Sequence, residues 1–320
     1  MNVRAATAQD AAGIVALHKS TNPHGDWFRD PFQRLGRVPY DDLTPFERWM
    51  HGGAWMDLSL FRRHFHEYQV RGFPVFVAEE AGRIVGECEV WVDEEPEPFG
   101  RYAEVEIVET ASRPDVEREL VQRAAEKVRK MGYSALDISP QHSGGAEVAT
   151  EMGFGPLWDT RTFTAEAAKV EAPDVEFETR FLTGGFEDLR GLLALNHREP
   201  ARLRYEIVTA RWPSAEFVGV RDVTKLLEVA VQAGDLKFAV LAARREWLDP
   251  DAAELDLWMD PGDLKDPDRV RTAASIGVEI ARRLGGKRVV AYASPTTAKA
   301  WKGIGFTGGD EPDPWLRLRF

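Results

Sequence analysis

Hydrophobic and polar residues follow the same order at the ends of the two halves of this chain. The first half closes with an amphipathic run over 115–132, an apolar run over 133–138, Ser139-Pro140 and Gly153-Phe154. The second half closes with an amphipathic run over 268–285, an apolar run over 289–293, Ser294-Pro295 and Gly305-Phe306. Each series predicts a helix, a buried strand and a short second helix. Because the spacing is far longer than a solenoid repeat, the pattern predicts two copies of one fold.

The pattern of the first half predicts a meander of strands that follows two helices. Thr7 is placed to cap a first helix after a short strand over 2–6, and a second helix is predicted over 57–72. Between them, the segment 22–56 is irregular and rich in aromatic residues. Three strands are predicted over 73–78, 84–92 and 102–109.

The second half gives a weaker version of the same pattern. We predict a strand over 175–182, helices over 186–195 and 225–233, and strands over 236–243 and 254–259, which leaves the meander one strand short. The arginine-rich stretch 198–211 is interpreted as a solvated helix face. The predicted domains are 1–164 and 175–320, joined by a linker over 165–174. This order of elements indicates an α/β (α+β) fold with mixed, mostly antiparallel sheets flanked by helices.

Composition and charge narrow the classes of partner. The chain has 320 residues, a formal net charge of -12 and one cysteine, Cys88. The acidic charge argues against general nucleic-acid binding, which depends on Lys and Arg. A single cysteine permits no internal disulfide and favours a reducing compartment. Neither a secretory leader nor an apolar stretch long enough for a membrane span is recognisable. We therefore expect a cytoplasmic protein with no nucleic-acid or membrane partner.

The order of these elements, with their punctuating residues, resembles the GCN5-related N-acetyltransferase (GNAT) superfamily. The pieces that carry the resemblance are Val3-Arg4-Ala5 with Ala8-Gln9-Asp10, the hairpin over 77–86, the closing stretch 146–154, and the stretches 289–295 and 298–306. The arrangement is similar to that of tandem two-domain members of the mycothiol-synthase type. The resemblance implies an acetyl-CoA-dependent N-acetyltransferase in which a small-molecule or peptide amine attacks the thioester directly.

In this family, a loop of the form Arg/Gln-x-x-Gly-x-Gly/Ala opens the helix after the fourth strand and binds the cofactor's pyrophosphate through its backbone. Counted back from Gly132, the glycine positions fall on Asp115 and Glu117; a one-residue shift places Arg113 at the family's Arg, with Val116 and Arg118 at its glycines. Neither register restores a glycine. The resemblance further implies that the backbone of Ile107 and Val108 holds the pantetheine arm.

Glu104 and Glu106 are the candidates for the general base. Side chains alternate along a strand, so these two carboxylates share one face of the predicted strand 102–109. The family commonly places its base there; the competing interpretation is a pair of solvated acids. The second-half equivalents are Glu254 and Asp256.

The family's usual general acid is a Tyr, which Ala149 and Trp301 replace here. His142 is the nearest titratable alternative, and its competing interpretation is a solvent-facing loop histidine.

Two further features have more than one interpretation. His64 and His66 lie two residues apart on a predicted helix, where they point in different directions, so we predict surface or packing roles and no metal. The aromatic segment 22–56 fits an acceptor pocket, a core extension or a contact between domains.

The missing glycines and tyrosines also support a second hypothesis, a non-catalytic ligand- or protein-binding module of the same fold. Under the first hypothesis, we expect the first half to be the active one, because its meander is more complete. The sequence defines neither the acceptor nor an oligomeric state.

Overall fold

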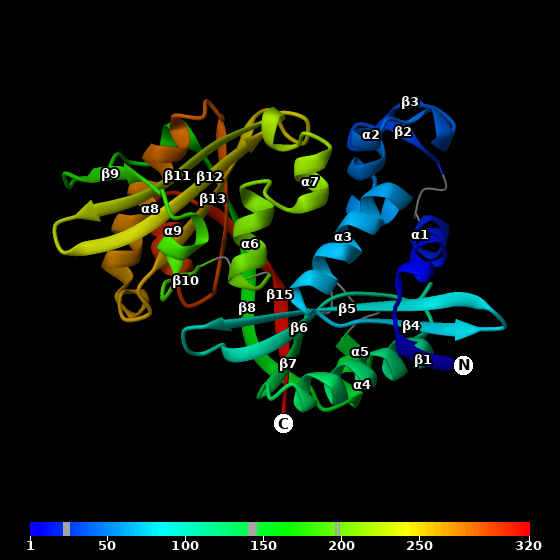
Figure 1. Cartoon of the computed structure of the whole chain (residues 1–320). Coiled ribbons are helices and arrows are strands. Elements are labelled where there is room, and N and C mark those ends of the chain that lie inside the picture. Colours follow the sequence, from blue (N-terminus) through cyan, green and yellow to red (C-terminus); the bar gives the residue numbers. More distant parts are fainter. Residues whose placement is uncertain (22–25, 140–145, 196, 198) are drawn as a thin grey trace.

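The computed structural model describes residues 1–21, 26–139, 146–195, 197 and 199–320 (Figure 1). Most predicted elements of the first half are present. In chain order they are β1 (Asn2–Ala5), η1 (Ala8–Asp10), α1 (Ala11–Ser20), β2 (Phe28–Asp30), β3 (Leu35–Arg37), η2 (Tyr40–Asp42), α2 (Pro45–Met50), η3 (Gly53–Met56), α3 (Leu58–Arg71), β4 (Val75–Glu80), β5 (Arg83–Glu95), β6 (Gly100–Glu109), α4 (Pro114–Lys130), β7 (Ala135–Ile138), α5 (Ala146–Glu151) and β8 (Gly155–Glu166).

The second half repeats the strand meander and the closing helix–strand–helix series. Its elements are η5 (Ala167–Lys169), β9 (Glu178–Phe181), η6 (Gly185–Leu189), β10 (Leu193–Ala194), α6 (Ala201–Val208), α7 (Pro213–Phe217), η7 (Arg221–Val223), β11 (Thr224–Ala233), β12 (Leu236–Arg245), β13 (Ala252–Met259), η8 (Asp263–Lys265), α8 (Pro267–Arg282), β14 (Arg288–Ala293), α9 (Ala298–Gly303) and β15 (Thr307–Arg319).

Local sequence explains the two long helices of the first half. The carboxylate of Asp57 caps α3 by accepting a hydrogen bond of 2.8 Å from the backbone N–H of Ser59. The helix ends at Gly72, whose φ of +74° is the left-handed conformation that glycine adopts without strain. Along α4, apolar residues recur with helical spacing from Val116 to Val128 and are buried against the sheet.

One 13-stranded sheet runs through both halves, in the order β1-β4-β5-β6-β7-β15-β8-β14-β13-β12-β11-β9, with β10 paired to β13 off this path. Among the described strands, only the pairs β6–β7 and β13–β14 are parallel. The fold is therefore mixed α/β with a mostly antiparallel sheet flanked by helices. No helix in the described part of the chain is both long and apolar enough to cross a membrane.

The two halves exchange strands at their junction. The end of β15, over 316–319, pairs with β7 of the first half. The end of β8, over 161–166, pairs with β14 of the second half. Figure 1 shows both strands running between the halves, with α6 and α7 lying between α3 and the second-half strands. The predicted boundary at residue 164 falls inside β8, and the domain limits stay a prediction.

Four predictions for the second half are wrong. The stretch 225–233 is strand β11, and it pairs with β12 along its whole length, so the meander of β11, β12 and β13 lacks no strand. The stretch 186–195 is not a helix but a short 3-10 turn followed by β10. Finally, the arginines of α6 do not all lie on a solvated face: Arg202 is exposed, but Arg204 is only 3% exposed.

Candidate active site

Strands β6 and β7 part in the middle of the first half. Their parallel pairing runs from Ala103 opposite Leu136 to Val105 opposite Ile138, and β6 continues to Glu109 with no further pairing to the described residues of β7. On its other edge, β6 pairs with β5 with a register shift that leaves Glu106 as an extra residue between Val105 and Ile107. Such a bulge re-aims a side chain and bends its strand. The result is a strand edge over 106–109 that faces an opening.

A cavity of about 620 Å³ occupies this opening. Its floor comes from β6 and the loop after it, through Glu106, Ile107, Val108, Glu109, Thr110 and Ser112. Its walls come from the aromatic segment, through Trp49, Gly53, Ala54 and Trp55, and from the second half, through Glu199, Leu203, Ile207, Trp212 and Ser214. The structure thus brings three of the predicted site residues, Glu106, Ile107 and Val108, to one cavity. The second-half wall was missed from sequence.

The aromatic segment packs on the core and reaches both the cavity and the second half, while its role as an acceptor pocket stays a prediction. Trp49 and Trp55 line the cavity. Trp49 also packs edge-on against Trp247 of the second half, with ring centroids 5.7 Å apart, and Phe46 does the same at 5.9 Å. The segment therefore forms both a cavity wall and a contact between the halves.

Glu106 has the electrostatic properties of a group that can exchange a proton near neutral pH. Its carboxylate accepts a hydrogen bond from the hydroxyl of Tyr68 on α3. Burial, opposed by His64 and supported by Glu199 and Glu206, raises the pKa of Glu106 to about 7. A general base works best when its pKa lies near the operating pH.

Glu104 lies on the same strand but outside the cavity. It is only 1% exposed, and neither carboxylate oxygen has a hydrogen-bond partner in the described part of the chain. Burial raises the pKa of Glu104 well above its usual range, so the group is protonated at neutral pH. Of the two acids predicted from strand alternation, only Glu106 reaches the opening.

Behind the cavity, two buried histidines pair with two glutamates of β5. His64 Nε2 lies 2.6 Å from Glu89, and although burial opposes it, the charge of Glu89 raises the pKa of His64. This pair is ionic, and Trp55 donates a further hydrogen bond of 3.1 Å to Glu89. His18 Nε2 lies 2.5 Å from Glu87, and burial lowers the pKa of His18 to about 4 while raising that of Glu87 well above its usual range. This second pair is neutral.

The histidine pairs give a packing role to one of the two histidines singled out from sequence. His64 is fully buried among aromatic rings, whereas His66 is exposed. Among the residues the structure describes, no group of three or more His, Cys, Asp or Glu side chains is arranged to hold a metal ion.

The loop between β6 and α4 carries backbone in the left-handed region at two non-glycine residues, Ala111 with φ +50° and Ser112 with φ +63°. The N–H of Ala111 donates to the carboxylate of Glu109 at 2.8 Å, and the N–H of Arg113 donates to the carbonyl of Thr110 at 3.2 Å, so both donors are bonded within the chain. Pro114 at the first position of α4 removes one donor. The N–H of Val116 donates to the carbonyl of Arg113 at 3.1 Å, and its side chain is buried against Gly86.

The two arginines predicted to hold phosphate are bound to carboxylates. The guanidinium of Arg113 pairs with Glu80 at 2.8 Å and with Asp115 at 2.7 Å. Arg118 pairs with Glu151. The loop therefore offers neither arginine as a free cation.

The equivalent opening of the second half is filled by the chain itself. Strand β10 lies against β13 with Leu193 opposite Met259 and Ala194 opposite Trp258, and the N–H of Leu195 donates to the carbonyl of Leu257 at 2.9 Å. These bonds use the edge of β13 beyond its pairing with β14, which ends at Leu255. A second extended ligand therefore has no free strand edge there.

A buried arginine, Arg204, binds both of the second-half acids. Arg204 Nε lies 2.9 Å from Asp256, and its guanidinium also binds Glu254. Arg204 and Arg245 outweigh burial and lower the pKa of Glu254 to about 2, whereas burial raises the pKa of Asp256 to about 6. These acids, predicted as the second-half equivalents of the base, are held in an ion cluster.

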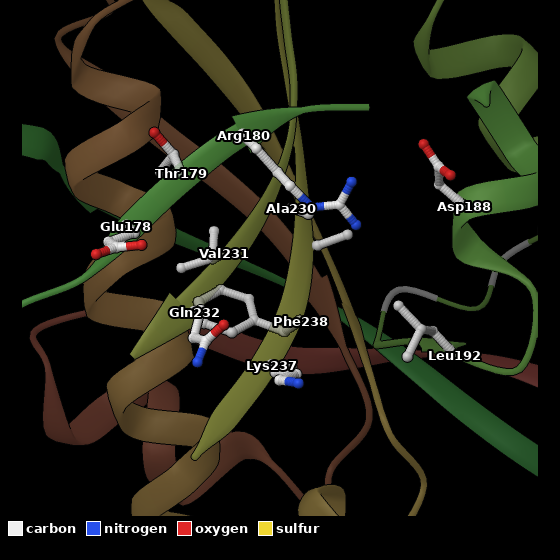
Figure 2. A pocket seen from close by; sticks show the side chains of 11 residues that line it. Glu178, Thr179, Arg180, Asp188, Leu192, Ala230, Val231, Gln232, Lys237 and Phe238 are labelled. Carbon is white, nitrogen blue, oxygen red and sulfur yellow. The ribbon is translucent and has the colours of Figure 1, made fainter. Parts of the chain in front are cut away.

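A second cavity, of about 350 Å³, lies at the far edge of the second half, between β9, β11 and β12 (Figure 2). Four charged residues line it: Glu178, Arg180, Asp188 and Lys237. The carboxylate of Asp188 accepts hydrogen bonds of 2.9 Å from the backbone of Thr183 and Gly184, so it caps a turn. This cavity is separate from Glu106 and brings together none of the predicted site residues.

The structure does not place His142, the remaining candidate for the general acid. Ala149 on α5 and Trp301 on α9, at the positions of the family's Tyr, are both buried. His142 lies outside the described residues.

Solved structures with the same architecture exist. A GCN5-related N-acetyltransferase from Anabaena variabilis matches 99% of this chain and 72% of its own length, with a TM-score of 0.58 and 10% identity. A tandem GNAT protein from the clavulanic acid biosynthesis pathway, in a structure without acetyl-CoA, matches 99% of this chain and 98% of its own length, with a TM-score of 0.51 and 13% identity. This chain has the tandem GNAT fold. A GCN5-related N-acetyltransferase from Sphaerobacter thermophilus also matches 99% of this chain and 95% of its own length, with a TM-score of 0.51 and 10% identity.

The tandem GNAT fold explains the repeated series in the sequence, and it confirms the resemblance as one of fold. No protein-family model matches the sequence, and no curated protein matches it. At these identities the likeness establishes the architecture, while the chemistry has to be argued from the residues of this chain.

Proposed function

We propose that the first half binds acetyl-CoA at the parted strands and transfers its acetyl group to an amine. The observation that carries this proposal is that the edge of β6 turned away from β5 over 106–109, beyond the pairing with β7, lines the cavity into which Glu106 opens. An unbonded strand edge offers backbone groups to an extended ligand with amide groups of its own, as the pantetheine arm has. The tandem GNAT fold supports the same class of reaction.

The proposed reaction divides the work among three groups. The carboxylate of Glu106 takes a proton from the acceptor ammonium, and the free amine attacks the thioester carbonyl carbon. Backbone N–H groups at Ile107 and Val108 polarise the carbonyl oxygen as negative charge develops on it. The attacking nitrogen then loses its second proton to solvent, the carbon–sulfur bond breaks, and the departing thiolate takes a proton from water, which leaves the amide and the free thiol of CoA. Tyr68, which donates to Glu106, positions the base.

We expect each chain to bind one molecule of acetyl-CoA. The second opening is closed by β10 and its acids are held by Arg204, so of the two equivalent openings in the described part of the chain, the one in the first half offers a free strand edge. Isothermal titration calorimetry should give a stoichiometry of one. Two equivalents would contradict the assignment of the second half as a filled site, and no heat at millimolar acetyl-CoA would contradict the proposed function itself.

Replacing Asp115 by Asn should tighten acetyl-CoA binding. The change removes a negative charge from the first turn of α4 and releases Arg113 from one of its two carboxylates, which leaves the turn more favourable for a pyrophosphate. We expect the dissociation constant to fall by about three- to tenfold at low salt, and the gain to shrink as salt rises.

Glu126→Gln is the matched control for this change, because it removes the same charge near the other end of α4. Calorimetry of both variants at two salt concentrations measures the effect. Equal affinities for D115N, E126Q and the unchanged chain would show that the pyrophosphate does not lie at this turn.

One observation favours a second candidate function, a non-catalytic binding module. Arg113 and Arg118 are both neutralised by carboxylates, which weakens the case for a tightly held pyrophosphate. This hypothesis expects an amine or another small molecule to bind without release of CoA. Single-turnover measurement of free thiol, with acetyl-CoA and a panel of primary amines, separates the two functions.

A further inference from the structure

The cavity at Glu106 has an acceptor side built from fixed aromatic rings. Trp55 stacks on His18 with ring centroids 5.7 Å apart and packs edge-on against His64 at 4.8 Å. Trp212 packs against the buried Trp91 at 5.5 Å. These contacts hold the indoles of Trp55 and Trp212 in place, so that with Trp49 they form a pre-organised aromatic surface. Leu203 and Ile207 add apolar area to this surface. Such a surface suits a flat or bulky apolar group.

The charge of the same cavity is negative. Glu106, Glu109 and Glu199 line it, and none of the described residues that line it is Lys, Arg or His. The two oxygens of Glu109 accept hydrogen bonds from the hydroxyl of Thr21 and the N–H of Ala111, which are neutral donors. From behind the wall, Arg204 lies 3.5 Å from Glu199, and His64, which is paired with Glu89, lowers the pKa of Glu106. A cavity of one sign concentrates ligands of the opposite sign.

An unpartnered hydroxyl supplies an independent sign that a ligand belongs here. Ser214 lines the cavity and is 0% exposed, and its Oγ has no hydrogen-bond partner in the described part of the chain. Buried polar atoms are normally paired, so a single buried hydroxyl at a cavity wall indicates a partner supplied by the occupant. The acceptor therefore needs a hydrogen-bonding group besides its amine.

We propose that the acceptor is a primary amine on an aromatic body that carries a hydroxyl and no carboxylate or phosphate. The ammonium lies at Glu106, the ring lies among the three indoles, and the hydroxyl pairs with Ser214. A carboxylate beside the amine would be brought close to the acids of the cavity, with no described cation in the lining to offset the repulsion. Attraction between a ring face and a cation adds to the binding of the ammonium. This inference rests on the proposed function and deepens it.

Tyramine and tyrosine form a matched pair of probes, since they differ only by the carboxylate. With acetyl-CoA present, we expect kcat/KM for CoA release to be at least about a hundredfold higher for tyramine, which corresponds to two tenfold steps in affinity for the transition state. Butylamine, which lacks the ring and the hydroxyl, should also be a poor acceptor. Equal rates for tyramine and tyrosine, or for tyramine and butylamine, would overturn the inference.

Glu199→Gln tests the source of the discrimination. We expect the tyramine-to-tyrosine ratio to fall by about tenfold, because one repelling carboxylate is lost. Glu176→Gln, which removes an exposed acid far along the chain from the cavity lining, should leave the ratio unchanged. An unchanged ratio in E199Q would assign the selectivity elsewhere and contradict this part of the inference.

Separate binding measurements distinguish failure of the inference from failure of the proposed function. If acetyl-CoA binds but the amines are not discriminated, the inference is wrong and the proposed function stands. If acetyl-CoA does not bind, the proposed function is wrong, and calorimetry with tyramine and tyrosine alone still decides which amine the cavity prefers. No preference in that titration would overturn the inference as well.

Discussion

Glu106→Gln should lower kcat/KM for acetyl transfer by about 10²- to 10⁴-fold, the usual contribution of a general base. The amide cannot accept the proton of the acceptor ammonium, yet it keeps the shape of the side chain and can still accept the hydrogen bond from Tyr68. Because the change leaves the strand edge over 106–109 intact, acetyl-CoA binding by calorimetry should stay within about twofold of its original value, a change well below one tenfold step.

The pH dependence gives the same prediction a second readout. Burial raises the pKa of Glu106 to about 7, so the carboxylate is protonated and inactive below that pH and becomes a base above it. The kcat/KM profile of the unchanged chain should therefore rise with pH through an apparent pKa near this value. His64, Glu199 and Glu206 act on this titration, and Tyr68 donates to the group itself. In E106Q the rise should disappear.

Glu104→Gln is the matched control on the same strand. Glu104 lies outside the cavity, and burial keeps its carboxyl protonated, so replacing it by a neutral amide should change activity little. If E104Q is inactive and E106Q is active, the base has been assigned to the wrong residue. If both variants keep full activity, neither strand carboxylate is the base.

Local pattern was sufficient for much of the first half. The apolar face of α4, the glycine that ends α3 and the alternation along β6 are all visible in the sequence, and each was placed close to its position in the structure. The same alternation pointed to Glu104 and Glu106 together. It could not separate them, because the bulge that re-aims Glu106 depends on the register between β5 and β6.

The errors of the second half have one physical cause, pairing between segments far apart in the chain. Strand β11 contains apolar residues at spacings that also fit a helix, and its pairing with β12 and β9 decides its conformation. Strand β10 is too short to give a pattern in the sequence. It pairs with β13, and the paired residues Leu193 and Met259 are more than 60 positions apart in the chain. The cavity wall from Glu199 to Ser214 follows from this placement, which explains why it was missed.

Arg204 is the residue for which sequence and structure differ most, and its loss should be severe. In Arg204→Met, the carboxylates of Glu254 and Asp256 lose the guanidinium that both of them bind. Removing one partner of a buried ion pair typically costs about 3–5 kcal/mol of unfolding free energy. We expect a loss of that size by chemical denaturation, which is a large fraction of the stability of an ordinary domain. Arg202→Met, on the exposed side of the same helix, should cost less than about 1 kcal/mol.

The double variant R204M/D256N shows whether the cost comes from the uncompensated charge or from lost packing. If the charge of Asp256 is responsible, replacing it by Asn should recover part of the loss, and the two changes should be coupled by about 1–3 kcal/mol. Additive effects would mean that Arg204 acts mainly through its packing.

The position of α6 links this stability to the first half: Leu203 and Ile207 on that helix line the cavity at Glu106. A helix anchored by the filled second site thus forms a wall of the open first site, so destabilising the anchor should raise the KM for the amine more than it changes the affinity for acetyl-CoA.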